Sequence, residues 1–361
     1  MTRGAAARGV RRRLVALVIA FAALAGPAQA KDVPLVLSKV TYGSSRPQIS
    51  WSLINERGKL VRKLDCNYNF GRRSHDGRRG VCVQDYLSRD ELLIVDLSTG
   101  ASSRIAKLPQ QTAQPQRTSQ FEGGADWAPD NRHFSIMVTE IHYAPFPPGG
   151  SSMFRTNVVM YDAVTGGAQP VTDYPFASSD SPAPQPISPV LTRDGSHVIY
   201  AETRGSREAS LQSIDVASGA RKTLVKSALP EFTLSPNSRR IAFCDKSGTK
   251  VKVADASGQV VQSFRARGAT VGAWSPNNRR FVFEERGSSQ GKTLLRIYDT
   301  KTRKITKLPE VYDGELPVWA PNSKRLATNS LARGAQIINL RGKVLRQLAR
   351  PRKGFVFGWA L

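Results

Sequence analysis

A short turn motif recurs along this chain and constrains its fold more than any other feature. The stretches ADWAPDNRHFSIMV (125–138), GAWSPNNRRFVFEE (272–285) and PVWAPNSKRLATNS (317–330) share a Trp, a Pro two residues later and an Asp or Asn after the Pro. Aligned on the tryptophan, six copies appear about 40 to 64 residues apart, anchored at Arg73, Trp127, Leu191, Leu234, Trp274 and Trp319. A chain that repeats one unit at this spacing predicts a repeat architecture.

Each copy predicts a hairpin turn followed by a strand. Asp or Asn stands three residues after the anchor, and Gly, Asn or Ser follows it, which suits a tight turn that needs positive φ. Apolar residues then recur at every second position, as at Phe281 and Phe283. This period of two is typical of β-strands and not of helices.

A second motif lies between the copies and consists of an apolar strand, a short turn and another strand. Examples are LLIVDLSTGASSRIAKL, NVVMYDAVTGGAQPVT, LQSIDVASGARKTLV and LLRIYDTKTRKITKL. The turn begins at an Asp whose carboxylate can accept a backbone N–H; these residues are Asp96, Asp162, Asp215, Asp255 and Asp299. One unit is therefore four strands in roughly 45 residues, which predicts an all-β fold, a β-propeller.

The two ends of the chain predict how the ring closes. INERGKLVRKLD (54–65) nearly duplicates INLRGKVLRQLA (338–349), so an outer hairpin precedes the first complete repeat. Trp359 lies 40 residues after Trp319 and marks an inner strand with no outer strands after it. We expect this strand to complete a blade with strands from residues 32–64, because such closure removes two free sheet edges. The count gives seven four-stranded blades, with six as the alternative.

The repeats resemble those of TolB-type propellers, in which Trp-Ser-Pro-Asp-Gly precedes two basic residues and an apolar strand. WSPNNRRFVF and WAPDNRHFSI match this pattern well, LSPNSRRIAF and WAPNSKRLAT match closely, and SHDGRRGVCV is degenerate. The similarity covers nearly all of residues 31–361, which we expect to form a single propeller domain, and it implies the fold more strongly than the function. TolB carries an α/β domain ahead of its propeller, and this sequence leaves no room for one, so we expect a TolB-like propeller without that domain.

The first thirty residues predict export. Five arginines precede the apolar run LVALVIAFAALAG, and Ala28-Gln29-Ala30 forms a small-x-small cleavage site, as in a cleaved secretory signal peptide. Removal of this segment lowers the 53 basic residues to 48 against 28 acidic ones, a net charge of about +20. The expected location is periplasmic or secreted, and ordinary secretion is favoured over the twin-arginine route.

Three cysteines are present. Cys66 and Cys82 flank a predicted hairpin turn and can face each other across it, so they are a candidate disulfide for an oxidising compartment. Cys244 is left over, and we expect it to be a buried apolar residue. Three unpaired thiols in the core are the alternative.

Signals of catalysis are sparse. The histidines His75, His133, His142 and His197 are scattered, and no His/Cys spacing suggests a zinc site. No α/β-hydrolase portion accompanies the repeats, so a prolyl-peptidase activity is not expected. We therefore expect a non-enzymatic protein with no cofactor and no metal. The alternative is a lyase or hydrolase with a site in the central funnel, acting on an acidic carbohydrate that the positive charge would suit.

Basic residues follow the repeated turns. In a four-stranded blade the first-to-second and third-to-fourth turns emerge on the same face of the propeller. That face is expected to carry a ring of positive charge that attracts anionic polymers or lipid head groups. Its candidate binding residues are Arg239, Arg240, Arg279 and Arg280. The alternative is an ordinary solvated surface.

Three long segments, 109–125, 139–157 and 173–189, interrupt the repeat and are expected on the opposite face, around one blade. Long loops in a compact repeat are usually functional or disordered, and these expose aromatic residues among Pro, Gly and Ser. The candidate binding residues are Phe121, His142, Tyr143, Phe146, Phe154, Arg155, Tyr174 and Phe176. The sequence thus predicts a monomeric interaction propeller for a protein or an anionic envelope component. Nucleic acid is not expected as its partner, and no transmembrane segment is expected in the mature chain.

Overall fold

A computed structural model describes residues 34–361 except 43–46, 68, 85–90, 109–116, 143–152, 179–182, 205–206, 288–292, 312–316, 330–333, 350–354 and 360–361. These residues belong to one compact unit, Pro34–Leu361. The predicted signal peptide, Tyr143 and Phe146 lie outside the described residues. The part of the chain that the structure describes consists of strands and turns, and it contains no helix able to cross a bilayer.

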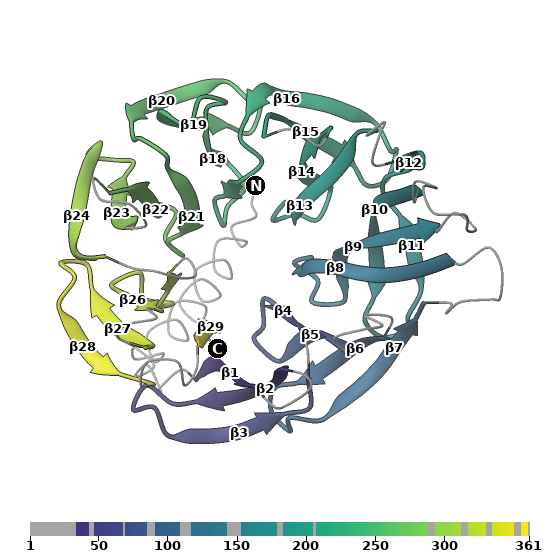
Figure 1. Ribbon diagram of the computed structural model, residues 1–361, viewed down its shortest axis with the longest axis horizontal. Coiled ribbons are helices and arrows are strands. Elements are labelled where there is room, and N and C mark those ends of the chain that lie inside the picture. The colour runs from purple at the N-terminus through teal and green to yellow at the C-terminus, as the bar shows by residue number, and fades with distance from the viewer. Residues whose placement is uncertain are drawn as a thin grey trace, which may run out of the picture. The chain divides into compact units, whose positions relative to one another are not determined.

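The strands form seven antiparallel sheets, and these are the blades of a β-propeller that follow one another around a ring (Figure 1). Blade 1 contains β29 (Phe355–Trp359), β1 (Leu35–Tyr42), β2 (Pro47–Ile54) and β3 (Leu60–Leu64). Blade 2 contains β4 (Asn69–Arg73), β5 (Arg79–Gln84), β6 (Glu91–Asp96) and β7 (Ser102–Lys107). Blade 3 contains β8 (Arg117–Trp127), β9 (His133–His142), β10 (Met153–Asp162), β11 (Ala168–Pro170) and the short β12 (Ala177–Ser178), which pairs with β10.

The remaining four blades each have four strands in chain order. Blade 4 contains β13 (Gln185–Leu191), β14 (His197–Thr203), β15 (Ala209–Asp215) and β16 (Arg221–Ala228), and blade 5 contains β17 (Phe232–Leu234), β18 (Arg240–Cys244), β19 (Lys250–Asp255) and β20 (Val260–Arg265). Blade 6 contains β21 (Thr270–Trp274), β22 (Arg280–Arg286), β23 (Thr293–Asp299) and β24 (Lys304–Val311). Blade 7 contains β25 (Val318–Trp319), β26 (Arg325–Thr328), β27 (Gln336–Asn339) and β28 (Val344–Gln347). The predicted all-β propeller with seven blades is confirmed.

Blade 1 is shared between the two ends of the chain, as predicted. The C-terminal strand β29 lies beside β1, with Leu35 opposite Trp359 and Val36 opposite Gly358. A bulge then shifts the register, so that Leu37 stands opposite Val356. Because the last strand pairs with the first, the ring closes through backbone hydrogen bonds, and β1 has a partner on both sides.

The repeated turn motif connects the inner strand of a blade to its second strand. The residue four positions after each anchor adopts a left-handed backbone in all six copies; these residues are Gly77, Asn131, Gly195, Ser238, Asn278 and Ser323. Gly, Asn and Ser occupy this position because a β-branched or bulky side chain would be strained at positive φ. The second motif also behaves as expected, since β6, β10, β15, β19 and β23 each end at its Asp.

The core consists of apolar layers between neighbouring blades. Phe281 and Phe283, on β22, are fully buried in the layer toward blade 5, together with Val251 and Val253 of β19. The anchor tryptophans also join blades through their indole N–H groups. Trp274 Nε1 donates to the backbone oxygen of Thr233, at 3.2 Å, in the inner strand of the preceding blade. The same bond from the indole to the backbone of the preceding blade is made by Trp319, which donates to the backbone oxygen of Ala273.

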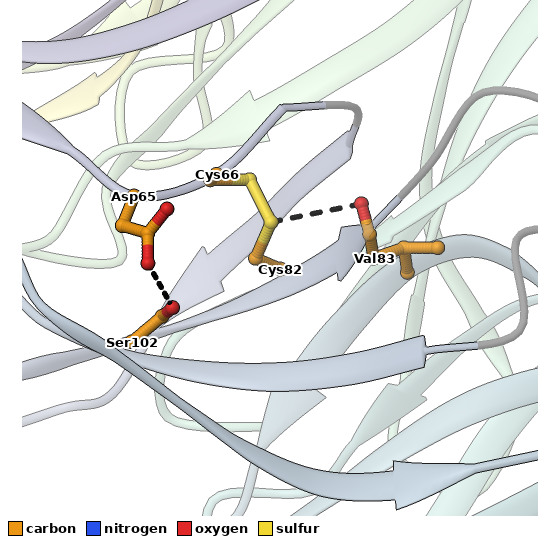
Figure 2. Close-up of a disulfide and its surroundings, with 5 residues drawn as sticks. All are labelled: Asp65, Cys66, Cys82, Val83 and Ser102. Atoms are coloured by element: carbon orange, nitrogen blue, oxygen red, sulfur yellow. Dashed lines mark hydrogen bonds between the residues drawn. A yellow bond between two sulfur atoms is a disulfide. The ribbon is translucent and has the colours of Figure 1, made fainter.

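A disulfide joins the connection between blades 1 and 2 to blade 2 itself (Figure 2). Cys66 follows β3 and Cys82 lies in β5, with their Cα atoms 5.8 Å apart. Beside it, the Ser102 hydroxyl donates to a carboxylate oxygen of Asp65. The third cysteine, Cys244, is buried with a free thiol, and burial raises its pKa to about 12.

Candidate functional site

Blade 3 extends beyond its neighbour on the face opposite the repeated turns. Its strands β9 and β10 have 10 residues each, whereas β5 and β6 of blade 2 have 6. Four additional residues correspond to about 13 Å of extra strand. Residues 109–125 and 139–157, predicted as loops, are therefore largely strand where the structure describes them. We call the face with the repeated turns the turn face and the other the connection face.

Four side chains gather on the extended end of blade 3, and we call them the blade 3 cluster: Glu140, His142, Arg155 and Phe176. The His142 and Phe176 rings lie with their centroids 4.1 Å apart, and the Arg155 guanidinium lies 4.7 Å from the Phe176 centroid. Register explains the grouping, because Glu140 stands opposite Arg155 on the same side of the sheet. The cluster combines an aromatic surface with a cation held over it.

Arg155 is fixed in this position by a bidentate contact. Its Nε donates to Glu140 Oε1 and its Nη2 donates to Glu140 Oε2, both at 3.1 Å. The two side chains remain about one third exposed, at 31% and 34%. Met153, on the same strand as Arg155, is 44% exposed and stands opposite His142. The end of blade 3 therefore presents a preorganised polar and aromatic surface with an apolar edge.

Three of the predicted aromatic residues do not belong to the blade 3 cluster: two are buried in the core, and one lies on the other side of the sheet. Phe121 is 2% exposed, because it is part of β8 and packs edge-on against Tyr161 in the core between blades 2 and 3. Tyr174 is 3% exposed and is likewise a core residue. The prediction that Phe121 and Tyr174 are exposed was wrong. Phe154 is half-buried and stands opposite Ile141, so it does not share the side of the sheet that carries Arg155.

Tyr174 joins blade 3 to blade 4. Its hydroxyl donates to Glu202 and lies 3.1 Å from the hydroxyl of Tyr200, and its backbone N–H donates to Asn157 Oδ1 at 2.7 Å. Burial, together with the Glu202 carboxylate, raises the pKa of Tyr174. Arg221 stacks on the outer side of its ring, 4.8 Å from the centroid. Tyr174 therefore positions the segment that carries Phe176.

The turn face carries the predicted arginines, but several of them are paired. Arg279 and Arg280 both contact Asp299 Oδ2, at 2.7 and 3.1 Å, and Arg240 donates to Thr300 Oγ1 at 2.7 Å. Arg239 is exposed and has no ion pair with a described residue. Asp299 is shared by two arginines and Thr300 is neutral, so these contacts offset one of the four positive charges, and Arg239 is the freest of the four predicted arginines.

The same pairing recurs in blade 3. Arg132 contacts Asp162 through Nε at 3.0 Å and Nη2 at 2.6 Å. The Arg132 guanidinium and the backbone N–H of Val164 hold the pKa of Asp162 well below its ordinary value. The acid that ends the third strand therefore serves as both a turn former and a counter-ion. This dual role was not anticipated, although the regular spacing between the basic pair and the acid carried the signal.

The four histidines each have a local partner. His75 contacts the backbone oxygen of Trp127 at 3.0 Å, His133 contacts Asp130 at 2.6 Å, and His197 contacts Ser196 Oγ at 2.7 Å. His142 belongs to the blade 3 cluster. Over the described residues, no three His, Cys, Asp or Glu side chains are grouped as a metal site requires.

No protein-family model matches this chain, and no curated protein matches it by sequence. Solved structures match its fold. An oligogalacturonate lyase in complex with manganese is 13% identical, with a TM-score of 0.58 over 81% of this chain and 85% of that chain. One of two prolyl endopeptidases is 15% identical, with a TM-score of 0.57 over 90% of this chain and 50% of that chain.

TolB from Acinetobacter baumannii is also among the similar structures. It is 16% identical, with a TM-score of 0.49 over 91% of this chain and 67% of that chain. Identities of this size show a common fold and do not transfer an activity, because one fold supports many functions. The chain is a seven-bladed β-propeller, and the solved structures that share its fold include a lyase and a peptidase.

Proposed function

We propose that this protein is an exported, non-enzymatic interaction propeller that binds a partner protein through the blade 3 cluster. The observation that carries the proposal is the contact of Phe176 with both His142 and Arg155 at the end of a blade whose strands are longer than those of its neighbour. Export is supported by the charge and hydropathy pattern of the first thirty residues and by the disulfide.

The chemistry of the cluster suits protein recognition. Aromatic residues, Met and Arg are enriched at the centres of protein interfaces, where a few of them supply most of the binding energy. Arg155 is already held by Glu140, so binding would cost little additional side-chain entropy. Met153 supplies an exposed flexible apolar contact beside it. The cluster therefore has the composition and the rigidity of a binding site.

An anionic component of the cell envelope is a second candidate partner. The mature chain carries a net charge of about +20, from 48 basic and 28 acidic residues. On the turn face, Arg78 and Arg239 are exposed and form no ion pair with a described residue. A basic surface of this kind attracts polyanions through screened electrostatics, and this attraction weakens as salt is added.

The two candidates are separated by crosslinking from defined positions. A photoreactive phenylalanine analogue placed at Met153 should form an adduct with a protein in envelope extract. Placed at Leu345, which is 47% exposed on blade 7, it should form none. Phe176→Ala and Arg155→Ala should each reduce the Met153 adduct at least about tenfold, which corresponds to about 1.4 kcal/mol of binding free energy.

A matched control distinguishes loss of binding from loss of folding. Leu345→Ala should leave both the adduct and the thermal midpoint unchanged, whereas the two cluster variants should change the adduct alone. An adduct that persists in Phe176→Ala and Arg155→Ala would contradict the proposal. Binding that disappears in high salt and in Arg239→Gln, with no effect of the cluster variants, would move the partner to the turn face.

A further inference from the structure

We propose that a cleft between blades 4 and 5, on the turn face, binds a small organic oxyanion. The cleft has a volume of about 630 Å³, within the usual range of small-molecule sites. It lies away from the blade 3 cluster and is independent of the proposed partner surface. Its polar walls include Arg193, His197, Lys222 and Ser238.

The cleft exists because blade 4 departs from the repeat. Five of the six repeats carry Arg or Lys five residues after the anchor, and blade 4 has Ser196 there. The next residue is Arg in four repeats, but in blade 4 it is His197. Blade 4 is thus the one repeat of the six with no Arg or Lys at either position.

At two other blade boundaries the long side chain at this last position reaches the next blade. Arg240 of blade 5 donates to Thr300 of blade 6 at 2.7 Å. Arg325 of blade 7 makes two bonds, of 2.6 and 2.9 Å, to Glu56 of blade 1. The two acceptors occupy equivalent places, because Thr300 directly follows the third strand of blade 6 and Glu56 lies in the turn after the third strand of blade 1.

At the boundary between blades 4 and 5 both members of this pair are shorter. The position of Arg240 is taken by His197, and the position of Thr300 is taken by Ala256. Both residues line the cleft. Histidine does not have the reach of arginine, and alanine offers no side-chain acceptor. The space that a bridging arginine fills at those two boundaries is therefore open here.

The cations at the cleft are free to bind a ligand, whereas its carboxylates are engaged within the protein. Arg193 and Lys222 are exposed, and neither forms an ion pair with a described residue. The acid on the rim, Asp194, is engaged by its own turn: its Oδ1 accepts from Thr192 Oγ1 at 2.6 Å and from the Ser196 N–H at 3.1 Å. Asp215 lies behind His197, with its Oδ2 atom 3.7 Å from Nε2, and accepts from Ser218.

Neutral groups complete the recognition chemistry. Ser238 Oγ accepts the backbone N–H of Arg193 at 2.6 Å, which leaves its own O–H oriented as a donor. Ile199 and Leu224 supply apolar walls beside these polar groups. Two cations, a hydroxyl donor and apolar walls suit a phosphate or carboxylate group attached to a small apolar body. Oxyanions of this kind are bound by charge-assisted hydrogen bonds.

The test measures binding of phenyl phosphate and benzoate to the purified protein by calorimetry. At least one of them should bind, and the tighter of the two identifies the head group as phosphate or carboxylate. Arg193→Gln and Lys222→Gln should each weaken binding about tenfold, the effect of losing one charge-assisted hydrogen bond. Lys304→Gln, which removes an exposed lysine from the equivalent outer strand of blade 6, should have no effect.

A second variant separates a built site from general attraction to a basic protein. His197→Arg with Ala256→Thr restores the bridging pair that Arg240 and Thr300 form elsewhere, and it should fill the cleft. Binding should then be lost although the protein gains a positive charge. Retained or stronger binding in this variant would overturn the proposal, as would the absence of binding by both probes. An unchanged thermal midpoint shows that the variant is folded.

Discussion

The side-chain oxygen of Asn278 accepts a hydrogen bond of 2.8 Å from the backbone N–H of Asn237, and the two residues belong to corresponding turns of adjacent blades. At three other boundaries the residue at this turn position also accepts a backbone N–H of the preceding turn: Asn131 accepts from Asp76, Ser238 from Arg193 and Ser323 from Asn277. In each case the acceptor has positive φ. The residue that shapes one turn therefore also binds the turn of the preceding blade.

This relationship predicts an order of stability for substitutions at Asn278. Asn278→Ala should lower the free energy of unfolding by about 2 kcal/mol, because it loses the hydrogen bond and places a Cβ without compensation at positive φ. Asn278→Gly should cost about 1 kcal/mol, since glycine accepts that backbone conformation freely. Urea denaturation of the three proteins measures both differences. A glycine variant more stable than the parent would show that the turn-to-turn bond contributes nothing.

Closure of the ring predicts the effect of a C-terminal deletion. Removal of 354–361 deletes β29, so β1 loses its partner at Leu35–Ser38. We expect a loss of several kcal/mol, a large fraction of a typical stability of about 5–15 kcal/mol, and a lower melting temperature for the whole propeller. Circular dichroism measures the midpoint. Deletion of Ala360 and Leu361 alone, which spares the strand, is the control and should melt as the full chain does.

Much of the fold could be predicted because the information is local and repeated. The turn at Asn277-Asn278, the alternation of Phe281 and Phe283, and the Asp299 that ends the third strand all lie within one unit of sequence. Six copies average out the degenerate ones, such as the repeat anchored at Arg73. Closure was predictable for the same reason, since Trp359 repeats the anchor of an inner strand.

The candidate site was predicted less well because its contacts are not local. Phe121 lies in a Gly-containing segment that reads as a loop, yet the long β8 brings it against Tyr161, 40 residues later. Tyr174 is buried against Val158 and Tyr200, and its hydroxyl donates to Glu202, 28 residues away. Arg279 is a candidate binding residue on sequence grounds, but it contacts Asp299 in the folded sheet. Pairing across strands decides exposure, and the alternation within one strand does not contain that information.

The disulfide predicts sensitivity to reduction. Cys66 and Cys82 are 16 residues apart, and closing a loop of this length contributes about 3 kcal/mol by restricting the unfolded chain. Cys66→Ser with Cys82→Ser should lower the urea midpoint accordingly. Dithiothreitol should lower the midpoint of the parent to the same value and leave the double variant unchanged. If dithiothreitol leaves the urea midpoint of the parent protein unchanged, the disulfide does not contribute this stability.

The burial of Glu284 predicts that the stability of the protein falls as the pH rises from 5 to 8. It lies on the side of β22 that carries Val282, toward the apolar layer with Trp319 and Leu326 of blade 7, and its Oε1 has no hydrogen-bond partner among the described residues. Burial raises its pKa to about 7 from an ordinary value of 4.5. A folded-state pKa above the unfolded one means that stability is fully present below pH 4.5 and is lost as pH rises through 7.

Glu284→Gln removes this titration and gives the clearest measurement of it. At pH 8 the parent must ionise a partly buried carboxyl group, so the variant should be more stable by about 2 kcal/mol. At pH 5 the parent carboxyl is protonated and the two proteins should differ little. Glu285→Gln is the control, because that carboxylate pairs with Arg296 at 3.3 Å on the other side of the same strand and should stabilise the parent at both pH values. If the difference between Glu284→Gln and the parent is the same at pH 5 and pH 8, the carboxyl of Glu284 does not titrate in this range and the burial argument fails.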